Sequence, residues 1–157
     1  LSGMEGVLLT GGTANASLFE KAKLTMINVW ATYCGPCLNE MPDLGALSEE
    51  WKAQGVQIVG VVSDAVNYQT GMLDSETMDV AKTIVRYTKA GYPHLLPSKS
   101  IESALLKDVS AVPTTVFVDA EGMQVGELVI GSRGKEDWER EMQARLAMLA
   151  QPAEKAE

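Results

Sequence analysis

The sequence predicts a single α/β domain in which a mixed β-sheet carries helices on its faces. Two apolar stretches, 24–30 and 56–63, have the length and composition of buried strands, and a helical pattern separates them. Two further strands and an amphipathic helix follow beyond residue 114. The chain has 157 residues, of which 46% are hydrophobic, and this suits one globular domain. We assign that domain to residues 1–150 and expect a disordered tail at 151–157.

The first strand leads into a long helix, expected over residues 34–54. Its apolar stripe consists of Leu38, Met41, Leu44, Leu47 and Trp51. Pro42 removes one backbone donor and should kink this helix, and Gly55 occupies the usual position after a helix end. The strand 56–63 is apolar on both faces, which is typical of the second strand of a parallel βαβ unit.

A second helix is predicted over residues 76–90. Its inward-facing residues are expected to be Val80, Ala81, Ile84 and Val85. A short extended segment at 92–96 follows it. Ser100 can then cap a brief helix that ends near Leu106.

The last part of the chain contains a predicted strand pair and a terminal helix. The strands 115–119 and 124–130 flank a turn that runs from Asp119 to Gly122. The helix 135–150 follows. Its apolar face is formed by Trp138, Met142, Leu146 and Leu149. Its other face is expected to carry two i,i+4 ion pairs, Glu136–Arg140 and Glu141–Arg145.

The two cysteines of the chain, Cys34 and Cys37, stand where the first strand gives way to the long helix. Free N–H groups and the helix dipole at such a position favour the thiolate, which is the nucleophile in disulfide exchange. We expect Cys34, at the helix start and facing solvent, to attack a partner disulfide. Cys37, one turn further and more shielded, would resolve the mixed disulfide. Gly35 and Pro36 let the turn between them close.

Composition and spacing exclude several other functions. A zinc site needs four ligands, and only the two cysteines and His94 offer soft or imidazole donors. Haem attachment needs a His after the second cysteine, where Leu38 stands. The net charge of −8 and the lack of a basic run argue against nucleic acid as a partner. The sequence has no run of about 20 apolar residues. We expect no metal and no cofactor beyond the redox-active cysteine pair.

The segment from Trp30 to Cys37 resembles the thioredoxin active site, WCGPC, with Tyr33 in place of the usual Trp. Within the thioredoxin superfamily, the chain is similar to the redoxin-like TlpA/ResA-type thiol–disulfide oxidoreductases of the bacterial cell envelope. Asn28, Cys37–Pro42 and Val112–Asp119 carry this closer resemblance.

The resemblance covers residues 5–150 in pattern and implies the thioredoxin fold. In that fold a βαβ half and a ββα half form one central mixed sheet flanked by helices. The helix and strand predicted at 76–96 then correspond to the insertion that this family carries between the two halves.

The resemblance also implies roles for residues outside the cysteine pair. It makes the Val112–Pro113 bond cis, so that the Val112 backbone can pair with a substrate chain. Asn28 stands where thioredoxin has a buried Asp, and the acid comes instead from the helix, as Glu40. A buried carboxylate there would have a raised pKa and could exchange protons with the second cysteine, whereas the alternative is a solvated Glu40. Tyr33 belongs to the apolar rim that meets partners.

The activity implied by the resemblance is the reduction of protein disulfides, in cytochrome c maturation or in redox homeostasis of the envelope. The partners would be protein dithiols or disulfides and a membrane-bound upstream electron donor. The protein would be a monomer outside the cytoplasm, with a signal or lipid anchor removed. Two alternatives stay open: a dithiol oxidase of secreted proteins, and a non-catalytic binding module with the same fold.

Overall fold

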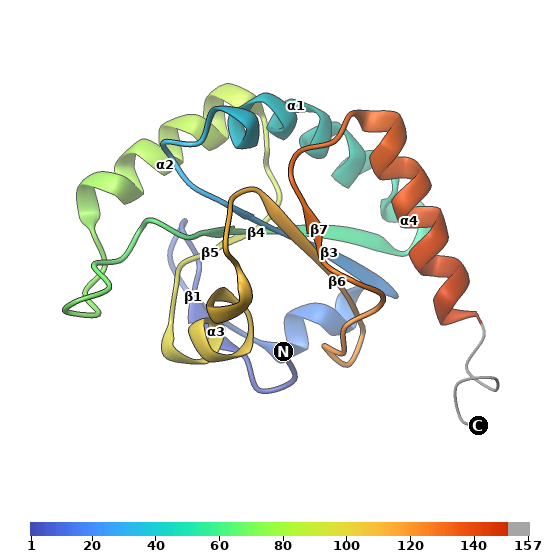
Figure 1. Ribbon diagram of the computed structural model, residues 1–157, viewed down its shortest axis with the longest axis horizontal. Coiled ribbons are helices and arrows are strands. Elements are labelled where there is room, and N and C mark those ends of the chain that lie inside the picture. The colour runs from blue at the N-terminus through green and yellow to red at the C-terminus, as the bar shows by residue number, and fades with distance from the viewer. Residues whose placement is uncertain (151–157) are drawn as a thin grey trace.

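The computed structural model describes residues 1–150, and the predicted tail lies outside the described residues. Its centre is a five-stranded sheet with helices on both sides (Figure 1). The strand order is β5 (His94–Leu95), β4 (Val56–Val62), β3 (Leu24–Trp30), β6 (Thr114–Asp119) and β7 (Val129–Ile130). β3, β4 and β5 are parallel, whereas β6 is antiparallel to β3 and β7 is antiparallel to β6. The predicted mixed sheet is therefore confirmed.

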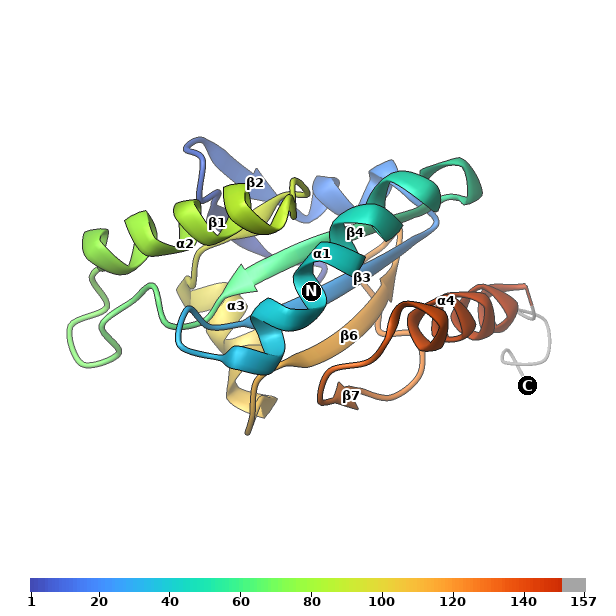
Figure 2. The ribbon, with the colours of Figure 1, turned by 90° about the horizontal axis from the view of Figure 1, so that it is seen from above.

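Three long helices cover one face of the sheet, and shorter elements cover the other (Figures 1 and 2). The long helices are α1 (Gly35–Glu50), α2 (Ser75–Thr88) and α4 (Lys135–Leu149). The opposite face carries α3 (Lys99–Ala104), the 3-10 helix η1 (Ala16–Lys21) and the hairpin β1 (Glu5–Val7) and β2 (Thr13–Asn15). Two 3-10 turns, η2 (Lys52–Gln54) and η3 (Leu106–Asp108), follow α1 and α3. None of the helices within 1–150 is both long enough and apolar enough to cross a bilayer.

β3 is buried along its whole length, and its alternating side chains belong to two separate cores. Met26 and Trp30 pack with the residues of α1 and α4, whereas Ile27 and Val29 pack with those of α3 and η1. Asn28 follows the same alternation, so its amide lies on the face that α1 covers. The alternation of side chains along β3 therefore places the polar Asn28 under α1, the helix that begins at the cysteine pair.

α1 approaches the end of α2 closely because Gly45 has no side chain. A Cβ atom on Gly45 would collide with the backbone carbonyl of Lys89. Pro42 lies inside α1, as expected. The helix ends at Glu50, and Gly55 ends the following turn in the left-handed region, with φ of 83°.

Two local predictions about the middle of the chain are wrong. Val80 is 49% exposed, whereas Ala81 is fully buried, because the apolar stripe of α2 is narrower than expected. The N-cap of α3 is Ser98, whose hydroxyl accepts from the backbone N–H of Ile101 at 3.2 Å. Ser100 instead donates its hydroxyl to a backbone carbonyl of β1.

The predicted strand 124–130 is largely irregular, and only its last two residues form β7. Gly126 interrupts it with φ of 78°, a conformation that L side chains rarely adopt. A Cβ atom on Gly126 would also collide with the Arg145 guanidinium. The strand pairing stops here because the backbone turns to receive a side chain from α4.

Arg145 is only 6% exposed. The sequence predicted it on the solvent-exposed face of α4, and that prediction is wrong. Its Nη1 donates to the carbonyls of Val125 at 2.7 Å and Glu127 at 2.9 Å. The predicted pair with Glu141 exists, with 3.3 Å between the charged atoms. The guanidinium also lies 4.7 Å from the ring centroid of Phe117. Arg145 therefore fastens the irregular segment to α4 and to the sheet.

We expect Arg145→Met to lower the free energy of unfolding by about 3 kcal/mol, because two buried carbonyls lose their charged donor. Urea titration followed by circular dichroism measures this change. The matched control is Arg140→Met in the same helix, since Arg140 is exposed and pairs with Asp137 rather than with the predicted Glu136. Its effect should stay within about 0.5 kcal/mol. Equal unfolding midpoints for the two variants would contradict this role of Arg145.

Candidate functional site

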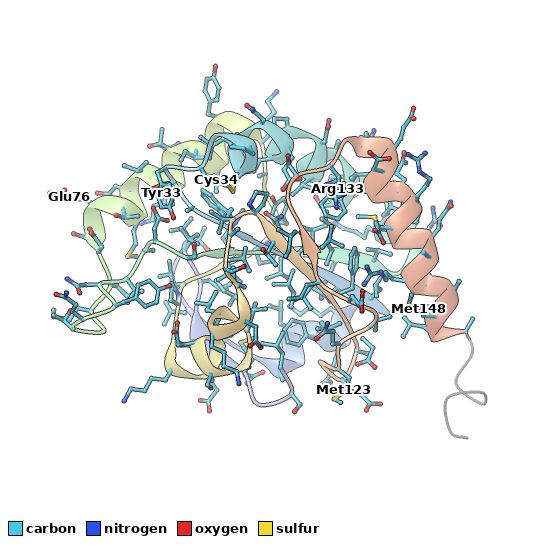
Figure 3. All side chains as sticks on the ribbon, in the orientation of Figure 1. Tyr33, Cys34, Glu76, Met123, Arg133 and Met148 are labelled. Atoms are coloured by element: carbon cyan, nitrogen blue, oxygen red, sulfur yellow. A yellow bond between two sulfur atoms is a disulfide. The ribbon has the colours of Figure 1, made fainter. Side chains whose placement is uncertain are left out.

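Cys34 and Cys37 form a disulfide at the N-terminus of α1, with their Cα atoms 5.3 Å apart. Cys34 is the N-cap of the helix, and its Sγ accepts from the Cys37 backbone N–H at 3.2 Å. Figure 3 shows Cys34 and Tyr33 in the loop that leads into α1. In the reduced protein, the same N–H and the helix dipole would favour a thiolate on Cys34. The geometry therefore supports the nucleophile expected from the sequence.

The surroundings of the disulfide are more closed than predicted. Cys34 is 6% exposed and Cys37 is fully buried, so the predicted order of exposure is right but Cys34 does not face solvent freely. The Cys34 sulfur is covered because it is bonded to Cys37 and lies close to the Val112 carbonyl. Tyr33, by contrast, is 77% exposed, and its place in a rim that meets partners stays a prediction.

The peptide bond between Val112 and Pro113 is cis, as the resemblance implied. The carbonyl oxygen of Val112 lies 3.6 Å from Cys34 Sγ. Pro113 offers no backbone donor at this position. A polypeptide that lies against Val112 would thus have its own cysteine next to the reactive sulfur.

Glu40 is buried in α1, one helical turn after Cys37, with 3% of its surface exposed. Its Oε1 accepts from the backbone N–H of Arg133 at 3.1 Å and from Trp138 Nε1 at 3.0 Å. Its Oε2 accepts from Asn28 Nδ2 at 3.1 Å. Burial raises the pKa of Glu40, although these three donors partly oppose the shift. The predicted buried carboxyl is confirmed, and the solvated alternative is wrong.

Asn28 can serve both protonation states of this carboxyl. Its Nδ2 donates to Glu40 and also to Thr115 Oγ1, at 3.1 Å each. Its Oδ1 is buried and has no hydrogen-bond partner among the described residues. Rotation of the amide by half a turn would present Oδ1 to a protonated Glu40, while the Thr115 hydroxyl can either donate or accept.

Sequence reasoning missed three contacts of the site. Trp138 was expected only to pack on the apolar face of α4, but its indole N–H also binds Glu40. The Arg133 backbone reaches Glu40 from the loop before α4, which Figure 3 shows beside the active-site loop. The backbone N–H of Thr32 donates to both carboxylate oxygens of Asp64 at 3.1 Å. Only the first had a signal in the sequence, because a buried Trp requires an acceptor.

His94 is buried and has a structural role next to Trp30, the last residue of β3. Trp30 Nε1 donates to its Nδ1 at 3.1 Å, so its Nε2 carries the proton and donates to the Ala90 carbonyl at 2.9 Å. Gly60 lies against the imidazole, and a Cβ atom there would collide with it. Burial lowers the pKa of His94 to about 4. The ring is therefore neutral in the folded protein at neutral pH.

We expect the contribution of His94 to the free energy of unfolding to fall as the pH is lowered from about 6.5 to about 4. In this window the unfolded chain binds a proton on His94 and the folded protein does not, so protonation favours unfolding. The loss amounts to roughly 3 kcal/mol for this one group. His94→Gln keeps an acceptor for Trp30 but cannot titrate, so its stability should depend less on pH across the window. Identical slopes in urea titrations of the two proteins would contradict the prediction.

Within residues 1–150, no group of three or more His, Cys, Asp or Glu side chains is arranged to hold a metal ion. The sulfur of Cys34 thus accepts the Cys37 N–H at the start of α1 and lies 3.6 Å from the Val112 carbonyl, and Glu40 is buried one turn further along the same helix.

Residues 5–140 of the chain match the Redoxin family. The chain is 29% identical over 123 residues to the thiol-disulfide oxidoreductase ResA of Bacillus cereus, a match that covers 78% of this chain and 64% of the relative. The matched part is thus just under two thirds of that protein.

Two solved structures are similar in fold. A thiol:disulfide interchange protein of the thioredoxin family from Chlorobium tepidum is 22% identical, with a TM-score of 0.72 over 91% of this chain and 92% of the other. A secreted thiol-disulfide isomerase from Corynebacterium glutamicum is 23% identical, with a TM-score of 0.72 over 95% of this chain and 84% of the other. These likenesses confirm that the chain has the thioredoxin fold.

Proposed function

This chain belongs to the Redoxin family, and from that premise we propose that it is a thiol–disulfide oxidoreductase that reduces disulfides of other proteins. The observation that carries this proposal is the Cys34–Cys37 disulfide at the start of α1, beside Val112 and above the buried Glu40. A protein that only binds a partner would not need this combination of a disulfide, a neighbouring backbone carbonyl and a buried acid.

The first step is attack by the Cys34 thiolate of the reduced protein on a sulfur of the substrate disulfide. The substrate S–S bond breaks, a bond forms between Cys34 and one substrate sulfur, and the other substrate sulfur leaves as a thiolate that takes up a proton. The Cys37 N–H and the helix dipole stabilise the attacking thiolate before the step. The Val112 carbonyl side of the site receives the substrate backbone.

The second step releases the substrate. The Cys37 thiol gives its proton to the Glu40 carboxylate, and its thiolate attacks Cys34 Sγ. The mixed disulfide breaks, the second substrate sulfur leaves as a thiolate that takes up a proton, and the protein retains the Cys34–Cys37 disulfide. Two electrons have passed from the protein to the substrate, so a separate dithiol donor must reduce the protein again. We propose that Glu40 acts in this step because it is buried one helical turn from Cys37.

We place this reaction outside the cytoplasm and assign the re-reduction to a membrane-bound donor. Two observations support the location: the similarity to a neighbour described as secreted and the family resemblance of the active-site segments. Cytochrome c maturation and envelope redox homeostasis are the two processes we propose for the activity.

Insulin reduction in the presence of dithiothreitol tests the activity. We expect the protein to accelerate the precipitation of insulin B chains well beyond the dithiothreitol blank. If correctly folded protein gave no acceleration, a binding module would be the better assignment.

The reduction potential of the cysteine pair tests the direction, by equilibration in a defined thiol buffer. A value near that of thioredoxin, about −270 mV, or below it would support a reductase. A value near about −120 mV would contradict it and indicate a dithiol oxidase of secreted proteins.

A further inference from the structure

A pocket of about 300 Å³ opens directly beside the active-site loop. Its walls come from three parts of the chain: Tyr33 of the loop itself, the segment after β4 with Asp64 and Tyr68, and the segment from Glu102 to Val112. The mechanism proposed above uses none of its polar side chains. It also has no counterpart among the features predicted from the sequence.

The position of the pocket is set by Val112, which belongs both to its lining and to the reactive centre. The Val112 carbonyl is 3.6 Å from Cys34 Sγ. A substrate chain that pairs with Val112 has its cysteine at the sulfur. A side chain close to that cysteine in sequence then reaches the pocket, since successive residues of an extended chain are about 3.3 Å apart.

The walls of the pocket fit an aliphatic stem. Leu106 and Val109 form apolar lining, and the rings of Tyr33 and Tyr68 stand at the pocket. Tyr68 is held in place by a hydrogen bond of 2.6 Å from its hydroxyl to the Ser63 carbonyl. Long side chains with charged ends bury their methylene groups along such surfaces.

Two carboxylates give the pocket its charge. Both oxygens of Asp64 are oriented by the Thr32 backbone N–H. Glu102 Oε2 is buried and has no hydrogen-bond partner among residues 1–150. Neither acid belongs to any of the salt bridges found in that part of the chain. The pKa of Tyr68 is raised by burial and then by the negative charges of Glu102 and Asp64. The pocket therefore presents unpaired negative charge at the end of an apolar wall.

We propose that this pocket is a specificity subsite for a lysine or arginine side chain that lies within three residues of the reacting cysteine of a substrate polypeptide. Glu102 is the principal anchor because it lines the pocket and its buried oxygen has no hydrogen-bond partner among residues 1–150. Asp64 supplies the second charge and ties the subsite to the active-site loop through Thr32. This inference rests on the proposed function and deepens it, since it names the substrate class.

The test uses symmetrical disulfide dimers of a seven-residue peptide with cysteine at its centre and alanine elsewhere. One residue at a time, at each of the six other positions, is replaced by Lys or by Glu. The pre-reduced protein is mixed with each dimer, and its oxidation is followed by thiol labelling and mass spectrometry. At one position or more, we expect the Lys dimer to react about tenfold faster than the Glu dimer at low ionic strength. The ratio should shrink in 0.5 M salt to roughly twofold.

Two variants locate the effect. Glu102→Gln keeps the shape of the side chain. In this variant the Lys dimer should react only about threefold faster than the Glu dimer, or less. Glu20→Gln makes the same change in net charge at an exposed residue of η1 that is not part of the pocket, and its ratio should match the wild-type value.

The outcomes separate the subsite from the activity. If the wild-type protein reduces the neutral disulfide of 2-hydroxyethanethiol but reacts equally with all Lys and Glu dimers, the subsite is wrong and the activity stands. An unchanged ratio in Glu102→Gln would also overturn the subsite. If the reduced protein reacts with neither the small disulfide nor any dimer, the proposed function itself fails. The comparison of Lys and Glu dimers uses the wild-type protein alone. It can therefore contradict the subsite even if a variant fails to fold.

Discussion

Replacing Cys37 by alanine should convert the protein from a turnover catalyst into a trap. Cys34 keeps its place at the start of α1 and can still attack a disulfide, but no second thiol remains to release the substrate. We expect insulin reduction to fall to the level of the dithiothreitol blank. When the pre-reduced variant is mixed with insulin in the absence of dithiothreitol, a covalent complex between the protein and an insulin chain should accumulate to about one per protein and be visible on non-reducing electrophoresis.

Cys34→Ala is the matched control, because it also leaves a single thiol in the chain. Its remaining thiol, Cys37, is fully buried in the structure, so it should give neither turnover nor the covalent complex. If Cys34→Ala formed the complex and Cys37→Ala did not, the roles assigned to the two cysteines would have to be exchanged. Dithiothreitol should dissolve the complex of Cys37→Ala, which distinguishes a mixed disulfide from other cross-links.

The core of the fold and the reactive pair could be predicted because their signals are local. The strand Leu24–Trp30 begins and ends as predicted, since its burial on both faces produces an unbroken apolar run. The cysteine spacing, the residues that follow it and Val112–Pro113 identified the site through resemblance. Glu40 could be assigned because it lies one turn from Cys37 on the same helix.

What could not be predicted depends on contacts between distant parts of the chain. Arg145 has the i,i+4 partner that suggests a solvent-facing ion pair, and only the turn at Gly126, 19 residues earlier, takes its guanidinium inside. The donors to Glu40 from Arg133 and Trp138 come from 93 and 98 residues away. The pocket with Asp64 and Glu102 combines three segments of no distinctive composition. The spacing of apolar residues shows which face of a helix or strand is buried. It does not show which polar group from a distant segment that face contacts.

Glu40→Gln should slow disulfide reduction by roughly one to two orders of magnitude at neutral pH, because the resolving thiol loses its proton acceptor. The pH profile should change as well. In the wild-type protein, activity should rise as the pH passes through the raised pKa of Glu40, where the carboxylate forms. The variant should lack this rise and show only the titration of its thiols. Full activity with an unchanged profile would show that another group deprotonates Cys37.

The same substitution should not destabilise the protein at neutral pH, and this separates a role in catalysis from structural damage. Because the folded pKa of Glu40 is raised, Glu40 binds a proton more readily in the folded state than in the unfolded state between pH 4.5 and the raised value, so its contribution to wild-type stability falls as the pH rises through that window. In the Glu40→Gln variant, the new side-chain amide can donate to the unpaired Asn28 Oδ1 while its oxygen keeps the donors from Arg133 and Trp138. We therefore expect a variant at least as stable as the wild-type protein at pH 7, with a flatter dependence on pH. Glu49→Gln, on the exposed side of the same helix, is the control and should change neither activity nor stability. A variant that is both inactive and much less stable would indicate that Glu40 serves the packing beneath the cysteines rather than their proton transfer.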